Sequence, residues 1–264
     1  MSQDNLRAAP GARIGGTDVS LNELLYTLKI TDRLDAFRNA ADDILILRAV
    51  KAENLSATGT ELQEEADSLR QQLGLLSAAD TETWMRQRHL SLDDFEQYVC
   101  RRVTARKLQD RLVGPKIESF FVANRAGLDV AGLWRIVVEN EEVAREVTTA
   151  LARPGASFAA LARKFTLDAA TRDAGGYSGH MLRMAMDPEL ATAVFLASPG
   201  AIVGPVRTQA GYEIVHVEEI RRASMNDHTR AVISDLLFNK WLQAGREEAG
   251  VQLAFVDQIV APEA

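Results

Sequence analysis

The hydrophobic pattern of this chain changes character near Asp129, and that change most constrains its fold. Over residues 20–126, apolar side chains recur at the three- and four-residue spacing of amphipathic helices. From Asp129 to about residue 222, short β-branched segments alternate with single helices and with turns marked by glycine and proline. Helical spacing returns after Ser224. The sequence therefore predicts an α+β fold in which a small mixed domain is inserted in a mostly helical module.

The boundaries of the predicted segments follow from this pattern. We predict a helical module over residues 1–128, a small α/β domain over residues 129–222 and a C-terminal segment over residues 223–264. Residues 1–18 are polar and glycine-rich, and we expect them to be mobile.

Local signals support the helices on both sides of the small domain. Thr58 is followed three residues later by Glu61, which is the capping-box spacing at the start of a helix. In the C-terminal segment, a helix over about residues 226–249 carries an apolar face that the small domain has no room to bury. We therefore expect this helix to pack back on the N-terminal helices, with a short strand over residues 251–256 after it.

Composition and the absence of several motifs narrow the function. The formal net charge of −7 argues against nucleic acid as a partner, because phosphate binding needs concentrated Lys and Arg. Cys100 is the only cysteine and the four histidines lack metal-binding spacing, so we expect no internal disulfide, no metal and no cofactor. No apolar run approaches the roughly 18 residues of a membrane span, and the first residues do not resemble a secretory signal. We expect no membrane insertion and a cytoplasmic location.

The most specific pattern lies between Gly155 and Val217. In order, it contains G-A-S-F-A-A-L-A, A-G-G-Y-S-G, M-D-P-E-L-A-T-A-V-F and G-A-I-V-G-P-V-R-T-Q-A-G-Y-E-I. We expect Gly175 and Gly176 to turn the chain into the central strand, at a point where a side chain would clash or demand a strained φ. Together these blocks resemble the parvulin (PpiC or rotamase) family of peptidyl-prolyl cis-trans isomerases over about a third of the chain. The resemblance implies a β-α-α-β-α-β-β domain that handles peptide or protein segments.

The helices before this domain are similar to those of SurA-type periplasmic chaperones. The segments that carry this resemblance are E-L-Q at residues 61–63 and L-D-D-F-E-Q-Y-V at residues 92–99. The resemblance implies a helical module that cradles extended polypeptide. The lack of a recognisable secretory signal departs from those periplasmic proteins.

Parvulins place two histidines beside the prolyl pocket, and both positions differ here. The first histidine is expected at the third position of L-W-R-I-V-V, where Arg135 stands. The second is expected directly after G-Y of the last strand, where Glu213 stands. Because these positions lie on neighbouring strands in the family's fold, we predict an ion pair between Arg135 and Glu213, with Asp168 near enough to join. A structural role and a ligand-binding role for this pair are both open at this point.

The resemblance also assigns other positions of the pocket. The candidate catalytic residues are Asp168, three residues after the Phe of the second helix, and Thr208, after G-P-V-R. The candidate peptide-binding residues are Arg135, Ser178, Met186, Leu190 and Glu213.

Three hypotheses for the function follow. The first is a parvulin-like peptide-binding protein or chaperone for polypeptide or precursor-peptide clients, with weak or no isomerase activity because both histidines are replaced. The second is an active prolyl isomerase with a variant network of Asp168, Thr208, Met186 and Arg135. The third is a scaffold protein that forms a homodimer through its helical module and serves a peptide maturation or export system.

Overall fold

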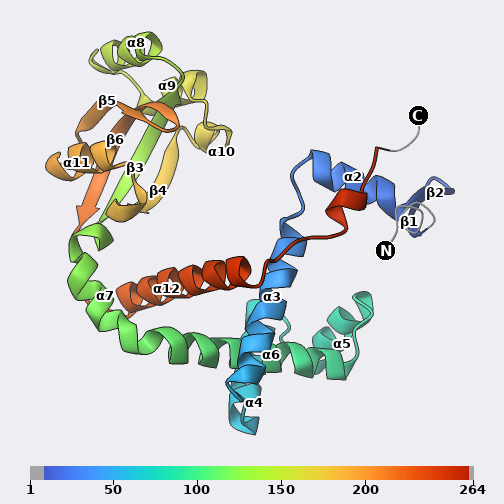
Figure 1. Cartoon of the computed structure of the whole chain (residues 1–264). Helices are drawn as coiled ribbons and strands as arrows, with labels where there is room; N and C mark the ends of the chain where they lie inside the picture. Colours follow the sequence, from blue (N-terminus) through green and yellow to red (C-terminus); the bar gives the residue numbers. More distant parts are fainter. Residues whose placement is uncertain (1–8, 262–264) are drawn as a thin grey trace. The chain divides into compact units, whose positions relative to one another are not determined.

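The computed structural model describes residues 9–261, and the chain divides into two compact units (Figure 1). The first unit contains the residues up to 115 together with those from 234 onward, and the second contains residues 116–233. Within the described residues, no helix is both long enough and apolar enough to cross a membrane.

The first unit is mostly helical. Its elements are β1 (Pro10–Ile14), β2 (Thr17–Ser20), α2 (Leu21–Ile30), α3 (Asp35–Ala52), α4 (Gly59–Gln72), α5 (Ala78–Gln87), α6 (Leu92–Val113), the C-terminal part of α12 (Asp227–Glu248) and the 3-10 turn η4 (Val256–Gln258). A second 3-10 turn, η1 (Gly114–Lys116), follows α6.

The capping box predicted at Thr58 is present at the start of α4. The Glu61 backbone N–H donates to Thr58 Oγ1 (3.3 Å), and the Thr58 N–H donates to the Glu61 carboxylate (2.7 Å). This exchange satisfies N–H groups that a helix start leaves without partners. Farther along, α4 packs on α6 through the buried side chains of Leu69, Phe95 and Val99.

Polar contacts connect α12 to earlier helices of the same unit. Gln109 of α6 donates from Nε2 to Ser234 Oγ (3.0 Å). Arg246 near the end of α12 pairs with the buried Asp42 of α3. Leu242, on the helix face expected to pack, is buried.

The start of the described chain has secondary structure that the sequence did not lead us to expect. Within the segment that we expect to be mobile, and two residues beyond it, residues 10–20 form a hairpin in which β1 and β2 pair antiparallel. Gly15 and Gly16 adopt φ of +56° and +86° at its turn. These two glycines supply the left-handed backbone that a tight hairpin turn requires. Residues 1–8 lie outside the described part of the chain.

The strand expected over residues 251–256 is not formed. A strand needs a neighbouring strand to satisfy its backbone, and this segment has the 3-10 turn η4 at its end instead. Beyond it, Ile259 is buried against Leu25 of α2. Asn22 donates from Nδ2 to the Val260 carbonyl (2.9 Å) and accepts the Val260 N–H (3.2 Å).

The second unit follows the predicted order of elements. These are α7 (Ile117–Asn124), η2 (Arg125–Leu128), β3 (Val130–Val138), α8 (Glu141–Leu151), α9 (Phe158–Phe165), α10 (Ala169–Arg172), β4 (Tyr177–Leu182), η3 (Arg183–Ala185), α11 (Pro188–Leu196), β5 (Ile202–Thr208), β6 (Gly211–Arg221) and the start of α12. The expected β-α-α-β-α-β-β arrangement is confirmed, with the one-turn helix α10 added before β4.

The four strands form an antiparallel sheet in the order β4-β3-β6-β5, with helices on both faces (Figure 1). Side chains alternate between the faces along each strand. On one face, Leu133 and Val215 pack with Leu190 of α11. On the other face, Ile136 and Ile214 pack with α8 and α9. Arg135 and Glu213 therefore belong to the face that α11 covers.

Candidate functional site

A pocket of about 370 Å³ opens on the α11 face of the sheet. It is lined by residues of β3, β4, β6 and η3, by the start of α11 and by the turn between β5 and β6. Five of the residues predicted from the sequence line it, namely Arg135, Met186, Leu190, Thr208 and Glu213.

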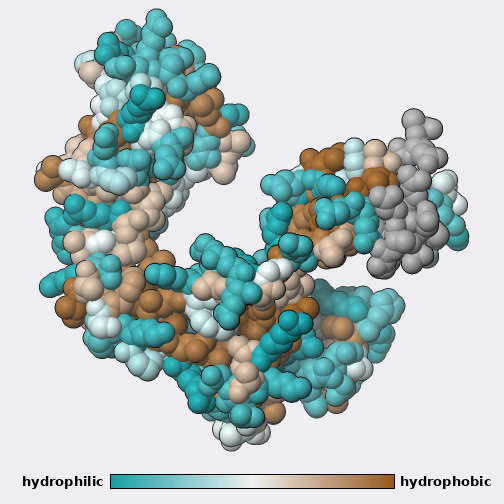
Figure 2. Space-filling view, viewed as in Figure 1, coloured by the Kyte–Doolittle hydropathy of each residue, from teal (hydrophilic) through white to brown (hydrophobic). Residues whose placement is uncertain are grey.

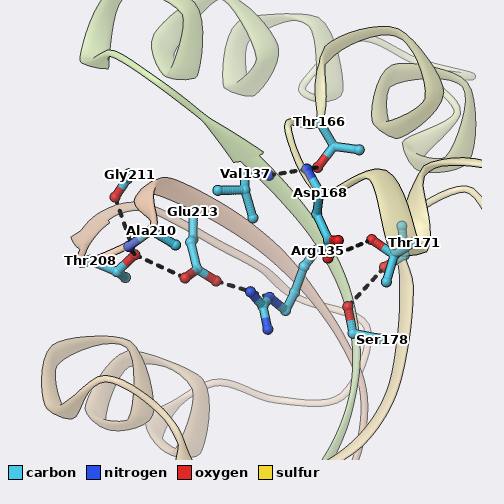
Figure 3. Close-up of polar contacts among 11 residues, drawn as sticks. Arg135, Val137, Thr166, Asp168, Thr171, Ser178, Thr208, Ala210, Gly211 and Glu213 are labelled. Atoms are coloured by element: carbon cyan, nitrogen blue, oxygen red, sulfur yellow. Dashed lines mark hydrogen bonds and ion pairs between the residues drawn. The ribbon is translucent and has the colours of Figure 1, made fainter. Parts of the chain in front are cut away.

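Arg135 and Glu213 form the predicted ion pair at the wall of this pocket (Figure 3). Arg135 Nε lies 3.0 Å from Glu213 Oε2. Arg135 is opposite Val215 in the β3–β6 register and Glu213 is opposite Val137, so the pair is diagonal across two strands. Both atoms are buried and neither makes a well-directed hydrogen bond, so charge attraction in a partly buried place dominates the contact.

Thr208, at the end of β5, contacts the other oxygen of Glu213 (Figure 3). Thr208 Oγ1 lies 2.9 Å from Glu213 Oε1 and 3.2 Å from the Gly211 carbonyl oxygen, and it accepts the Ala210 N–H at 3.2 Å. A hydroxyl has one proton, so it donates to one of these two acceptors at a time. Arg135 and Thr208 thus each approach one oxygen of the Glu213 carboxylate. These contacts offset the cost of burying a charged residue that is only 4% exposed.

The floor of the pocket is apolar. Met186 and Leu190 are buried, and Met181 of β4 packs beside them in the same hydrophobic core. An apolar floor next to polar groups suits a ligand with a hydrophobic ring and a neighbouring amide. The ring buries apolar surface on the floor, and the polar groups of the wall can form hydrogen bonds with the amide.

Asp168 and Ser178 lie outside the lining of the pocket. The Asp168 carboxylate accepts the Thr171 hydroxyl (2.9 Å) and the Ala170 N–H (3.1 Å), so it caps α10 rather than joining the ion pair (Figure 3). Ser178 donates to the Gly176 carbonyl (3.2 Å). Hydrogen bonds to groups two or three residues away hold both side chains, which supports a positional role for them.

Six residues line the pocket that the sequence did not single out. They are Met181, Ala185, Asp187, Pro188, Gln209 and Ala210. Two sequence signals point to some of these residues. The segment M-D-P-E places Pro188 in the first turn of α11 and Asp187 as the cap of that helix, where Asp187 Oδ1 accepts the Glu189 N–H (3.1 Å). The segment T-Q-A-G marks the turn that contains Gln209. Met181 faces the pocket because of the register of β4, which the sequence pattern does not fix.

The strand order, the helices on both faces and the pocket beside α11 define a parvulin-type peptidyl-prolyl isomerase domain. Residues 138–219 match the rotamase family, described as a PPIC-type PPIASE domain. The chain therefore contains a domain of this family, as its sequence blocks indicated.

Several known proteins are similar to this chain. A foldase protein PrsA from Caldanaerobacter subterraneus subsp. tengcongensis is 27% identical over 196 residues, covering 74% of this chain and 59% of that protein. A foldase protein PrsA 2 from Listeria monocytogenes serotype 4b is 39% identical over 85 residues, covering 32% of this chain and 29% of that protein. The matched segments thus span less than two thirds of the length of these two relatives.

Solved structures are also similar at low sequence identity, and one of them serves as an example. A crystal structure of the peptidylprolyl isomerase PrsA from Bacillus anthracis aligns with a TM-score of 0.47 and 19% identity, covering 83% of this chain and 99% of that chain.

Proposed function

We propose that this chain is a parvulin-like chaperone that binds proline-containing stretches of polypeptide or precursor-peptide clients, with weak or no prolyl isomerase activity. The family match of residues 138–219 and the foldase names of the relatives support a chaperone of the prolyl isomerase type. The apolar floor formed by Met186 and Leu190 supports proline as the residue that enters the pocket.

The buried ion pair between Arg135 and Glu213 is the observation that carries the weak-activity part of the proposal. Prolyl isomerisation passes through a twisted amide that has lost its resonance, and the barrier to rotation is about 18–20 kcal/mol. Only groups that stabilise the twisted state more than the planar one accelerate the reaction. Here the charged groups at the two positions where parvulins have histidines are engaged with each other and with Thr208. The pocket then stabilises the bound peptide, but it stabilises the twisted amide little more than the planar one.

One observation favours the alternative of an active isomerase with a variant site. Arg135 keeps 19% of its side chain exposed and lines the pocket, so its guanidinium can donate to a carbonyl oxygen of a bound peptide. Thr208 also lines the pocket and can exchange its hydrogen bond to Glu213 for one to the peptide. Asp168 was part of this alternative, but its carboxylate accepts a hydrogen bond from Thr171 and caps α10.

Apolar side chains at the surface of the helical unit support the chaperone part of the proposal. Leu76, Leu92 and Ile44 are all more than half exposed. Figure 2 shows further hydrophobic surface along α6 and α12. By its exposure, Trp241 of α12 is only half-buried. Exposed apolar surface of this kind is typical of sites that bind other polypeptides.

A peptide-binding experiment tests the proposal. Fluorescence anisotropy would compare a labelled peptide with a central Ala-Pro and the same peptide with Ala in place of Pro. We expect the proline peptide to bind more tightly, and Met186→Gln to weaken that binding because it places an amide in the apolar floor. Met184→Gln is the matched control, since Met184 is exposed and does not line the pocket.

Equal binding of the two peptides would contradict the assignment of this pocket to proline. Thermal melts would show whether Met186→Gln folds. Thr208→Val offers a second pocket variant at a position that is not part of the buried core.

A further inference from the structure

A second, larger cavity of about 890 Å³ lies on the opposite face of the sheet from the candidate prolyl pocket. Val130 of β3 and Leu182 of β4 are register partners and form part of its floor. Because side chains alternate along a strand, Val130 and Leu182 face away from α11. The helices α8 and α9 cover this face at Ile136, so the cavity occupies the other end of β3, beside the start of α12.

The wall of this cavity is rich in basic side chains and hydrogen-bond donors. Two arginines and two histidines line it, Arg221, Arg222, His180 and His228, together with the polar side chains of Ser224 and Thr229. None of its lining residues, all of which are described, is an Asp or Glu. This composition contrasts with the net charge of −7 of the chain. The first turn of α12 adds the partial positive charge of a helix start and also carries Asp227, which does not line the cavity.

Two carboxylates contact these basic side chains without using all of their donors. Glu219 Oε1 lies 2.6 Å from His180 Nε2 and 3.3 Å from a terminal nitrogen of Arg221. Asp129, which is buried, accepts a hydrogen bond from Arg222 (2.6 Å). A guanidinium carries five N–H donors, so each arginine keeps several for a ligand. Both arginine side chains remain more than half exposed.

We propose that this cavity binds a carboxylate-bearing segment of a polypeptide, with an acidic side chain between Arg221 and His228 and an apolar neighbour on Val130 and Leu182. A guanidinium group recognises a carboxylate through charge-assisted hydrogen bonds, and a histidine ring offers an N–H donor. The volume falls in the range of about 300–1,000 Å³ that is typical of ligand sites, and it exceeds what a single small anion fills. The occupant, a client polypeptide, rests on the proposed function, but the site lies on the other face of the domain from the prolyl pocket.

A proline-free peptide tests this site apart from the prolyl pocket. Anisotropy titrations with the full chain would use a labelled decapeptide of alternating Glu and Leu, and its isosteric counterpart with Gln for Glu. We expect the Glu peptide to bind at least about tenfold more tightly, and the difference to shrink with added salt. The double variant Arg221→Gln with His228→Asn should lose most of this preference. Both side chains are exposed, so the variant should keep its fold.

Two matched variants separate this inference from the proposed function. Arg145→Gln makes the same change of charge at an exposed position of α8 and should leave binding of the Glu peptide unchanged. Thr208→Val alters the prolyl pocket and should also leave it unchanged. The inference is overturned if the Glu and Gln peptides bind equally, or if the double variant keeps the affinity of the unchanged protein for the Glu peptide. Capture by vesicles with anionic lipid, without any binding of the Glu peptide, would likewise overturn it.

Discussion

Arg135 and Glu213 lie diagonally across β3 and β6 with Nε and Oε2 3.0 Å apart, and their burial is unequal. The Glu213 side chain is 6% exposed, whereas that of Arg135 is 19% exposed. Removing one partner therefore has different consequences on the two sides. Without Arg135 a buried carboxylate loses its counter-charge, whereas without Glu213 a partly exposed guanidinium can turn toward water.

This asymmetry predicts the outcome of a double-mutant cycle. Arg135→Ala should lower the free energy of unfolding by about 3–5 kcal/mol, the usual cost of breaking a buried pair. Glu213→Ala should cost less, and the double change should cost less than the sum of the two. Urea unfolding followed by circular dichroism measures all three. Strict additivity would show that the two charges do not interact.

Gly176 allows a second prediction about the same strand. It adopts φ of +87°, and a Cβ there would lie 2.5 Å from the Arg135 carbonyl oxygen. The Gly176 carbonyl also accepts the Arg135 N–H (2.7 Å). Gly176→Ala should therefore destabilise the domain and displace Arg135.

Gly179→Ala is the matched control for this change. Gly179 has a similar φ of +71°, but a Cβ at this position would meet no other atom within 4 Å, so the change should cost only the backbone strain of about 1–2 kcal/mol. Thermal melts of the two variants separate strain from collision. Equal losses of stability in Gly176→Ala and Gly179→Ala would contradict this prediction. They would show that the backbone moves at no cost to relieve the close contact with the Arg135 carbonyl oxygen.

Asp129 joins segments at both ends of the small domain, which gives a third prediction. Its carboxylate accepts the Ala223 N–H (2.9 Å) and the Arg222 guanidinium (2.6 Å). Asp129→Ala should leave the buried Ala223 N–H without a partner and cost about 1–3 kcal/mol in chemical unfolding. Arg222→Ala should cost about 1 kcal/mol or less, because it removes only the exposed partner. Equal effects of the two changes would contradict this account.

Glu61 gives a pH-dependent prediction for the helical unit. The backbone N–H of Thr58, and then Lys107, lower the pKa of Glu61 from 4.5 to about 2. A carboxyl whose pKa is lower in the folded state stabilises the fold above the unfolded pKa and loses that contribution as pH falls. The free energy of unfolding should therefore fall as pH is lowered from 4.5 to about 2.

Glu61→Gln should remove this part of the pH dependence, because an amide does not titrate in that range. NMR titration of the Glu61 side chain gives its pKa directly. An ordinary value near 4.5 would show that the capping hydrogen bond does not persist in solution.

The sequence predicts the elements whose signals are local and leaves open those that depend on contacts between distant residues. The capping box at Thr58 and the glycine blocks depend on the chain within a few residues, so they locate α4 and the turns of the domain. The hairpin over residues 10–20 was missed because its few apolar residues give no clear strand pattern. The segment over residues 251–256 has apolar residues but no strand to pair with.

The distinction between local signals and contacts of distant residues also holds for the candidate prolyl pocket. Arg135 and Glu213 could be placed from matching blocks because both stand at fixed positions within strands. Asp168 could not, because its partner is the local helix α10 and not the sheet. Met181 was missed because the register of β4 shifts between Leu133 and Trp134 of its partner strand. A one-residue shift decides which face a side chain occupies.

We propose that this domain binds proline segments while accelerating their isomerisation little, and one measurement tests this directly. NMR exchange spectroscopy on a short Ala-Pro peptide, with the full chain added, gives the cis–trans exchange rate and the bound fraction together. We predict that the peptide signals shift on binding and that the cis–trans exchange rate stays close to the uncatalysed one. Uncatalysed isomerisation of an Xaa-Pro bond takes tens of seconds or longer. The double variant Arg135→His with Glu213→His should increase the rate if the two charges are the cause. Fast exchange with the unchanged protein would contradict the account and establish an active isomerase with a variant site.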